Sequence, residues 1–149
     1  MRLVLQRVSQ ASVSVDGKIV GQIDKGYLIL LCVMKGDTAK DAGWLAEKVC
    51  GLRLFDGPDG KINDRSLLDV KGEALVVSQF TLAGDVRKGR RPDYTAAAVP
   101  AEAEALYGQF LQTLRSLGIS KVEGGSFGAH MFVSLTNDGP VTILLDTAS

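Results

Sequence analysis

The stretch Leu75-Val76-Val77-Ser78-Gln79-Phe80-Thr81-Leu82 decides how the rest of the chain is organised. Its first half continues an apolar run that begins at Ala74, and such a run predicts a strand buried on both faces of a sheet. Three small hydrogen-bonding side chains, those of Ser78, Gln79 and Thr81, follow where the apolar run ends. Polar groups are common at ordinary strand ends, where they satisfy a turn. The same pattern also suits a rigid platform that holds hydrogen-bond donors in place, as acyl chemistry requires.

Length, composition and net charge limit the number of domains and the ways in which the chain could bind a partner. Its 149 residues fit one domain spanning residues 1–149, and hydrophobic residues make up 46% of them, which is too many for a disordered chain. Basic and acidic residues number 17 each, so the formal net charge is zero. A protein that held nucleic acid chiefly through its overall charge would be more basic. An RNA partner would therefore have to be held by a local basic patch or by shape.

Few residues are available for metal or nucleophilic chemistry. His130 is the only histidine and has no obvious carboxylate partner in sequence, so we expect it at the surface or behind the site. No Cys, His and carboxylate cluster has the spacing of metal ligands, and we expect neither a metal nor a cofactor. Cys32 and Cys50 lie among aliphatic residues, which favours buried thiols over a disulfide or a nucleophile. No signal peptide and no apolar run of about 20 residues is evident, so we expect a cytoplasmic protein without a membrane span.

Apolar patterning predicts a mainly antiparallel sheet. The Asp16-Gly17 pair is the strongest hairpin signal and is typical of a two-residue type I′ turn. Strands outnumber helices and hairpin turns dominate, which indicates an α+β fold. Two of the expected strands are joined through Asn137-Asp138-Gly139-Pro140. The predicted strands are 3–15, 18–23, 27–33, 52–55, 74–77, 121–123, 131–135 and 141–145.

Two helices are expected to pack against this sheet. The first begins after Asp37 or Thr38 and ends near Gly51, and the second begins at Pro100 and stops at Gly118. Each has apolar residues at helical spacing, which we interpret as a core face without chemistry. The expected core residues are Trp44, Leu45, Val49 and Leu52 in the first helix and Leu106, Phe110, Leu114 and Leu117 in the second.

The only concentrated positive charge follows the polar platform directly. It consists of Arg87, Lys88, Arg90 and Arg91, four basic residues in five positions. Charge runs are usually solvated loops, but a phosphate-bearing substrate bound at the platform would pass its backbone over this one. We therefore expect these residues to contact RNA. The ring of Tyr94 could stack on a terminal base.

Two of these motifs resemble a known pair. Ser78-Gln79-Phe80-Thr81-Leu82 together with Asn137-Asp138-Gly139-Pro140-Val141-Thr142 is similar to the signature motifs of the D-aminoacyl-tRNA deacylases, also called D-tyrosyl-tRNA deacylases. The resemblance covers nearly the whole chain and includes Gln6-Arg7-Val8 and the segments 57–63, 87–92 and 127–131. It implies an α+β fold with a mainly antiparallel sheet or partly closed barrel and two main helices. It also implies a homodimer that acts on the aminoacylated 3′ end of tRNA, with no metal and no membrane.

The chain departs from the usual family pattern at a few positions. Family members usually have methionine at Ile62, Ser-Phe at Asp93-Tyr94, arginine at Ser126 and aspartate at His130. An aromatic ring at Tyr94 keeps the capacity for stacking, whereas Asp93 adds a negative charge near the RNA. The roles of Ser126 and His130 stay open.

The resemblance implies roles for individual residues. It places Ser78, Gln79, Phe80 and Thr81 in the catalytic site, with substrate contacts from Phe127, Ala129 and Met131. The Gly139-Pro140 peptide, which as an ordinary turn would be trans, is cis in the family and inserts into the active site of the other subunit. There its carbonyl oxygens accept from the amino group of the substrate, and its backbone blocks an L side chain. The arginine that matches Arg7 braces this loop.

Two catalytic schemes and two other functions remain as alternatives. Backbone N–H groups near Phe80 and Thr81 are candidate donors to an oxyanion. Thr81 could act as a nucleophile, but no general base is evident, and the scheme associated with the family uses the 2′-hydroxyl of the tRNA to assist water. Glycyl-tRNA has no side chain to clash and is expected to be a substrate. The other functions are a non-catalytic module that binds tRNA ends and a broad ester or amide hydrolase that accepts L-esters.

Overall fold

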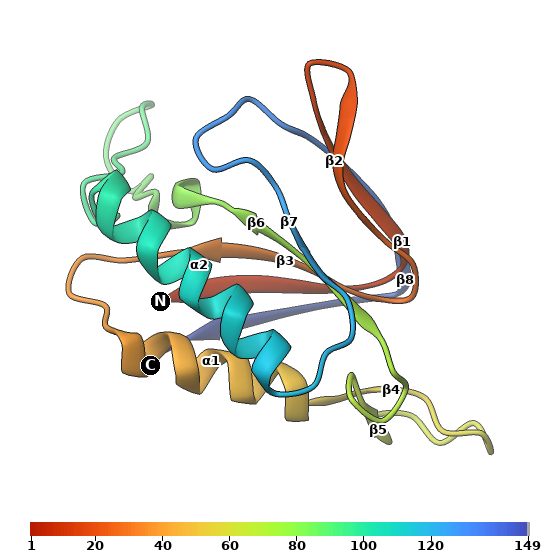
Figure 1. The fold of residues 1–149 in the computed structure, drawn as a ribbon. Helices are drawn as coiled ribbons and strands as arrows, with labels where there is room; N and C mark the ends of the chain where they lie inside the picture. The colour runs from red at the N-terminus through yellow and green to blue at the C-terminus, as the bar shows by residue number, and fades with distance from the viewer. Residues whose placement is uncertain (149) are drawn as a thin grey trace.

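Six strands form one sheet and two α-helices cover it within residues 1–148, which the computed structural model describes (Figure 1). A separate two-stranded ribbon projects from the end of the first helix. The strands are β1 (Arg2–Val15), β2 (Lys18–Ile23), β3 (Gly26–Cys32), β4 (Arg53–Phe55), β5 (Arg65–Ser66), β6 (Glu73–Ser78), β7 (Val122–Gly124) and β8 (Phe132–Asp146). The helices are α1 (Ala39–Gly51), α2 (Pro100–Ser116) and the short 3-10 helix η1 (Phe80–Ala83).

The long strand β1 organises the sheet. It pairs antiparallel with β8 along one edge and with β3 and then β2 along the other. The β1–β2 turn has positive φ at both Asp16 (51°) and Gly17 (78°), as a type I′ turn requires. Beyond β3 the sheet continues through two parallel pairs, β3 with β6 and β6 with β7. The expected α+β fold with a mainly antiparallel sheet is confirmed.

The sheet curls until its two ends meet, which gives the partly closed barrel that the resemblance implies. At Gly21 of β2 an added Cβ would lie 2.5 Å from the carbonyl oxygen of Gly124 in β7, so only glycine permits this approach. The barrel interior is a small aliphatic core that contains Val13, Leu75 and Val77. A larger core lies between the opposite face of the sheet and the two helices.

The helix boundaries are confirmed, but the buried faces differ in part from the prediction. In α1 the predicted core residue Trp44 is 45% exposed, and Leu52 is half-buried at the helix end. In α2 the buried stripe contains Tyr107 and Leu111, while Leu106 and Leu117 are only partly buried against the core. The residues that α1 buries are Ala42, Leu45, Ala46, Val49 and Cys50.

The prediction of two separate strands at 131–135 and 141–145 is wrong. Both segments belong to β8, and both pair antiparallel with the same strand β1, so the chain does not reverse between them. The segment around Asn137 and Pro140 is accommodated by irregular register opposite Val8. Cys32 and Cys50 are buried and free, as expected. No helix in the described part of the chain is long and apolar enough to cross a membrane.

Candidate active site

A cavity of about 560 Å³ opens where β6 ends and the segment after β7 crosses over the sheet. Most of its lining is apolar, and the polar groups gather at the end of β6. The structure thus brings together residues that are about 50 positions apart in the sequence. Seven of the predicted site residues line this cavity: Ser78, Gln79, Phe80, Tyr94, Phe127, Ala129 and Met131.

The polar lip of the cavity is the junction of β6 and η1. Residues 74–77 are fully buried, and the strand ends at the half-buried Ser78. Phe80 and Thr81 are the first two residues of η1, so their N–H groups have no acceptor within that helix. The first bond of the turn runs from the N–H of Leu82 to the carbonyl of Gln79, at 3.2 Å. Two backbone donors therefore remain available at the lip.

The side chains around the lip are held in place by further bonds. The Gln79 amide donates to the Thr81 hydroxyl at 2.5 Å. From β1, the Arg2 guanidinium donates to the carbonyl of Leu82 at 2.9 Å. These contacts fix η1 against the end of the sheet, so the lip is preorganised.

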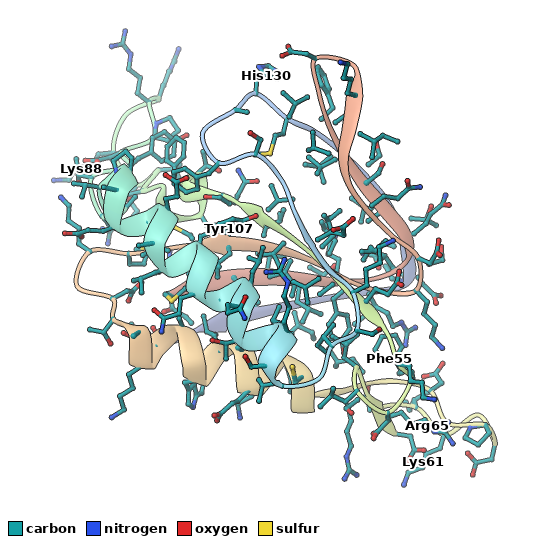
Figure 2. The ribbon with its side chains drawn as sticks, in the orientation of Figure 1. Phe55, Lys61, Arg65, Lys88, Tyr107 and His130 are labelled. Carbon is teal, nitrogen blue, oxygen red and sulfur yellow. The ribbon has the colours of Figure 1, made fainter. Side chains whose placement is uncertain are left out.

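The cavity has few side chains that could act as a general acid or base. Among the described residues that line it there is no carboxylate, imidazole, amine or thiol, and the phenol of Tyr94 is the only titratable group. Cys32 lies behind the lip, and burial raises the pKa of its thiol, so it is protonated at neutral pH. His130 is exposed, on the loop near the tip of the β1–β2 hairpin, with its ring 5.2 Å from that of Phe132 (Figure 2). In residues 1–148 no group of three His, Cys, Asp or Glu side chains could hold a metal ion.

The basic residues lie on a loop next to the cavity, not inside it. Two backbone hydrogen bonds between Asp85 and Asp93, at 2.8 and 2.9 Å, close the base of this loop. Lys88 projects from it beyond the start of α2 (Figure 2). Arg87 forms a two-point ion pair with Asp85, and the hydrogen bonds from Arg87 lower the pKa of that carboxyl to about 2. Lys88, Arg90 and Arg91 are exposed.

An aromatic pair joins this loop to the lip. The rings of Phe80 and Tyr94 meet edge to face at 5.3 Å, and Tyr94 is 37% exposed. One side of the Tyr94 ring is thus held by the protein while another remains open.

The Gly139–Pro140 segment lies elsewhere. Its peptide bond is cis, as the resemblance implies. The Arg7 guanidinium donates to the carbonyl of Asp138 at 2.8 Å and to that of Leu54 at 2.7 Å, so it does brace this segment. None of Arg7, Gly139 and Pro140 lines the cavity.

Strand register shows how far apart the two regions are. Arg7 pairs with Tyr27, which pairs with Ala74, whereas Ser78 is four residues further along β6. At ~3.3 Å per residue this is about 13 Å along the strand. The Gly139–Pro140 segment, which Arg7 contacts, is therefore separated along the sheet from the Ser78 end of its own cavity.

Two large apolar side chains of β8 are mostly exposed. Phe132 is 65% exposed and Leu144 is 69% exposed, on the strand that also holds Pro140. Phe132 lies opposite Ser14 of β1 and Leu144 lies opposite Val4, so the two exposed apolar side chains stand at opposite ends of β8.

Comparison with known proteins identifies the family. The family model described as D-Tyr-tRNA(Tyr) deacylase matches residues 4–146. This chain belongs to the D-Tyr-tRNA(Tyr) deacylase family. Curated relatives named D-aminoacyl-tRNA deacylase include one from Thermomicrobium roseum, which is 60% identical over 99% of this chain and 95% of its own length. Another, from Fervidobacterium nodosum, is 57% identical over 99% of this chain and 97% of its own.

A solved structure has the same fold. The c-Myc DNA Unwinding Element Binding Protein superposes with a TM-score of 0.93 and 40% identity, covering 99% of each chain.

The structure also shows what the sequence motifs of the deacylase family did not point to. The apolar back wall of the cavity comes from the end of β3 and from the segment that leads into α2. The small residues in the run 96–98 were the one available signal, because they leave space in front of the helix. The positions of departure from the usual deacylase pattern lie outside the lining, except for Tyr94. The back wall consists of Val33, Ala97, Ala98, Pro100 and Ala103.

Proposed function

We propose that this chain hydrolyses the ester bond between a D-amino acid and the 3′-terminal adenosine of tRNA, and so acts as an aminoacyl-tRNA editing enzyme. Its membership of the D-Tyr-tRNA(Tyr) deacylase family supports this reaction. The observation that carries it is the cavity of about 560 Å³, with backbone donors at one lip and apolar walls, which suits a small acylated nucleoside. The reaction belongs in the cytoplasm, where charged tRNA is used.

In this proposal the protein positions the ester and stabilises the oxyanion, and the RNA itself assists the attack of water. The N–H groups of Phe80 and Thr81 stabilise the oxyanion of the tetrahedral intermediate, and each such donor is typically worth ~10²–10³ in rate. The absence of a general base among the described lining residues supports a scheme in which the tRNA 2′-hydroxyl assists the attack of water. The protein then holds the ester and the water in the required geometry.

Discrimination between D- and L-amino acids in this proposal requires a second copy of the chain. Because Gly139 and Pro140 do not line their own cavity, they can reach an active site only in a partner subunit. The exposed apolar side chains of Phe132 and Leu144 on β8 support a homodimer, and Arg7 keeps the segment rigid. In the partner cavity the main chain of Gly139–Pro140 forms a wall that the side chain of an L-amino acid would strike. A D-amino acid directs its side chain outward, and glycine has none, so both are accepted.

In this proposal the basic loop binds the tRNA backbone. Lys88, Arg90 and Arg91 are exposed beside the cavity and contact phosphates, while Tyr94 offers its open face to the terminal base. Arg87 contributes less than its neighbours, because Asp85 already neutralises it.

A deacylation assay with three substrates tests the proposed function. Substoichiometric protein is mixed with D-tyrosyl-, L-tyrosyl- and glycyl-tRNA, and the released amino acid is measured over time. We expect multiple turnovers on the D-tyrosyl and glycyl substrates and none on the L-tyrosyl substrate. Binding without release would indicate a tRNA-end binding module, and equal release from both tyrosyl esters would indicate a broad ester hydrolase.

A further inference from the structure

The two walls of the cavity diverge at one point, the end of the β6–β7 ladder. The last pair of this ladder is Val76 with Gly124. Beyond it, β6 continues to Ser78 and the polar lip, whereas the other strand leaves the ladder and brings Phe127 to the opposite wall. The width of the cavity is therefore set where these two strands part.

A single hydroxyl group from α2 occupies this point. The hydroxyl of Tyr107 donates to the carbonyl of Val76 at 2.7 Å and accepts from the N–H of Gly125 at 3.2 Å. The same N–H lies 3.3 Å from the carbonyl of Val76, so the three groups form a closed triangle. Tyr107 is 8% exposed, and its ring lies 6.1 Å from that of Phe127. Figure 2 shows Tyr107 labelled where α2 crosses the sheet.

We propose that Tyr107 is a positioning residue for ester hydrolysis. It does not line the cavity, so it acts through the two segments that do. By tying β6 to the segment that follows Gly124, its hydroxyl fixes the distance between the N–H donors of the lip and the wall formed by residues 127–129. This role rests on the proposed function, because the atoms that must be aligned are those of the bound ester.

Removing only the hydroxyl tests the role. Tyr107→Phe keeps the ring and its packing but leaves the carbonyl of Val76 and the N–H of Gly125 without this link. We expect kcat on D-tyrosyl-tRNA to fall about tenfold, because sub-ångström misplacement of reacting groups affects the chemical step strongly. We expect KM to change less than about twofold, since the tRNA contacts lie elsewhere. The assay is run well below the melting temperature of each variant, so that a loss of stability alone does not lower kcat.

The chain offers a matched control. Tyr27 is fully buried in the same core as Tyr107, and its hydroxyl has no hydrogen-bond partner in the described part of the chain. Tyr27→Phe is therefore the same chemical change without a lost bond, and we expect kcat and KM to stay at the values of the unmodified protein. A loss of kcat in Tyr27→Phe equal to that in Tyr107→Phe would overturn the proposal.

A second variant reaches the same point from the backbone. A Cβ on Gly124 would lie 2.6 Å from the Tyr107 hydroxyl and 3.1 Å from Leu111, so Gly124→Ala displaces the hydroxyl. We expect Gly124→Ala to lower kcat as Tyr107→Phe does. We expect kcat of the double variant to be no lower than kcat of the less active single variant. Losses that multiply would show that the two changes act independently and would overturn the proposal.

Hydrogen exchange separates this proposal from the proposed function. In Tyr107→Phe, and not in Tyr27→Phe, we expect faster exchange of the backbone amides from Gly125 to Ala129. This measurement requires no activity, so an unmodified protein that fails to deacylate any substrate would contradict the proposed function alone. Unchanged exchange and unchanged kcat in Tyr107→Phe would contradict the positioning role alone.

Discussion

At the scale of single residues, Thr81 distinguishes the two catalytic schemes. Its hydroxyl accepts from the Gln79 amide, and no general base lines the described cavity to activate it. We therefore expect Thr81→Ala to keep turnover of D-tyrosyl-tRNA within about tenfold, measured under single-turnover conditions. A nucleophile would be far more sensitive, since removing one from a hydrolase typically costs about 10⁴-fold or more. A loss of that size with intact tRNA binding would assign the attack to Thr81.

Asp85 offers a residue-scale test of the basic loop. The hydrogen bonds from Arg87 lower the pKa of this carboxyl to about 2. A carboxyl whose pKa is lowered by folding contributes to stability above its unfolded value and loses that contribution as the pH falls towards about 2. The pair therefore persists at neutral pH, and between pH 5 and 8 it adds no pH dependence to tRNA binding.

Asp85→Asn should release Arg87 for phosphate contact. We expect tighter binding of uncharged tRNA and a steeper salt dependence, by about one ion in the slope of log K against log salt concentration. Filter binding at several salt concentrations measures both. Asp24→Asn makes the same change of charge at an exposed site on the β2–β3 turn and should have a smaller effect. Equal effects of the two variants would show that only net charge matters.

At the scale of elements, α1 shows which of two adjacent apolar residues supports the fold. Leu45 is fully buried, whereas Trp44 is 45% exposed with the Lys48 amine 5.4 Å from its ring centroid. We expect Leu45→Ala to lower the free energy of unfolding by about 2–5 kcal/mol and Trp44→Ala by less than about 1 kcal/mol. Urea denaturation of both variants measures the difference. Similar losses would mean that Trp44 is covered in solution.

Elements were predictable from the sequence where their signals are local. The Asp16–Gly17 turn and the helix start at Thr38 depend on a few neighbouring residues, and both lie where the sequence places them. The burial of Trp44 was mispredicted because helical spacing alone does not say which side of a broad apolar face meets the sheet. The continuity of β8 was missed because it depends on pairing with β1, 118 to 144 residues away in the sequence.

At the scale of the whole molecule, the homodimer is the main open prediction. Leu144→Glu places a charge at an exposed apolar position of β8. We expect this variant to be monomeric and to lose deacylation of D-tyrosyl-tRNA, because the cavity then lacks the Gly139–Pro140 wall of a partner. Sedimentation velocity measures the state of association. Trp44→Glu is the control, since it makes the same change of charge at an exposed apolar side chain of α1, and it should stay dimeric and active. A fully active monomer would contradict the cross-subunit wall.

Short stretches of residues were enough to predict the buried strand β6, the polar groups at its end and the lack of a metal-ligand pattern. These follow from residue types within a short window, because backbone preference and burial act locally. The folded chain was needed to show that Phe127 and Met131 line the same cavity as Ser78, and that the Tyr107 hydroxyl lies where the two walls part. It alone showed that Pro140 does not line its own cavity. Such relations depend on how the sheet curls and which strands pair, and no local stretch of residues encodes them.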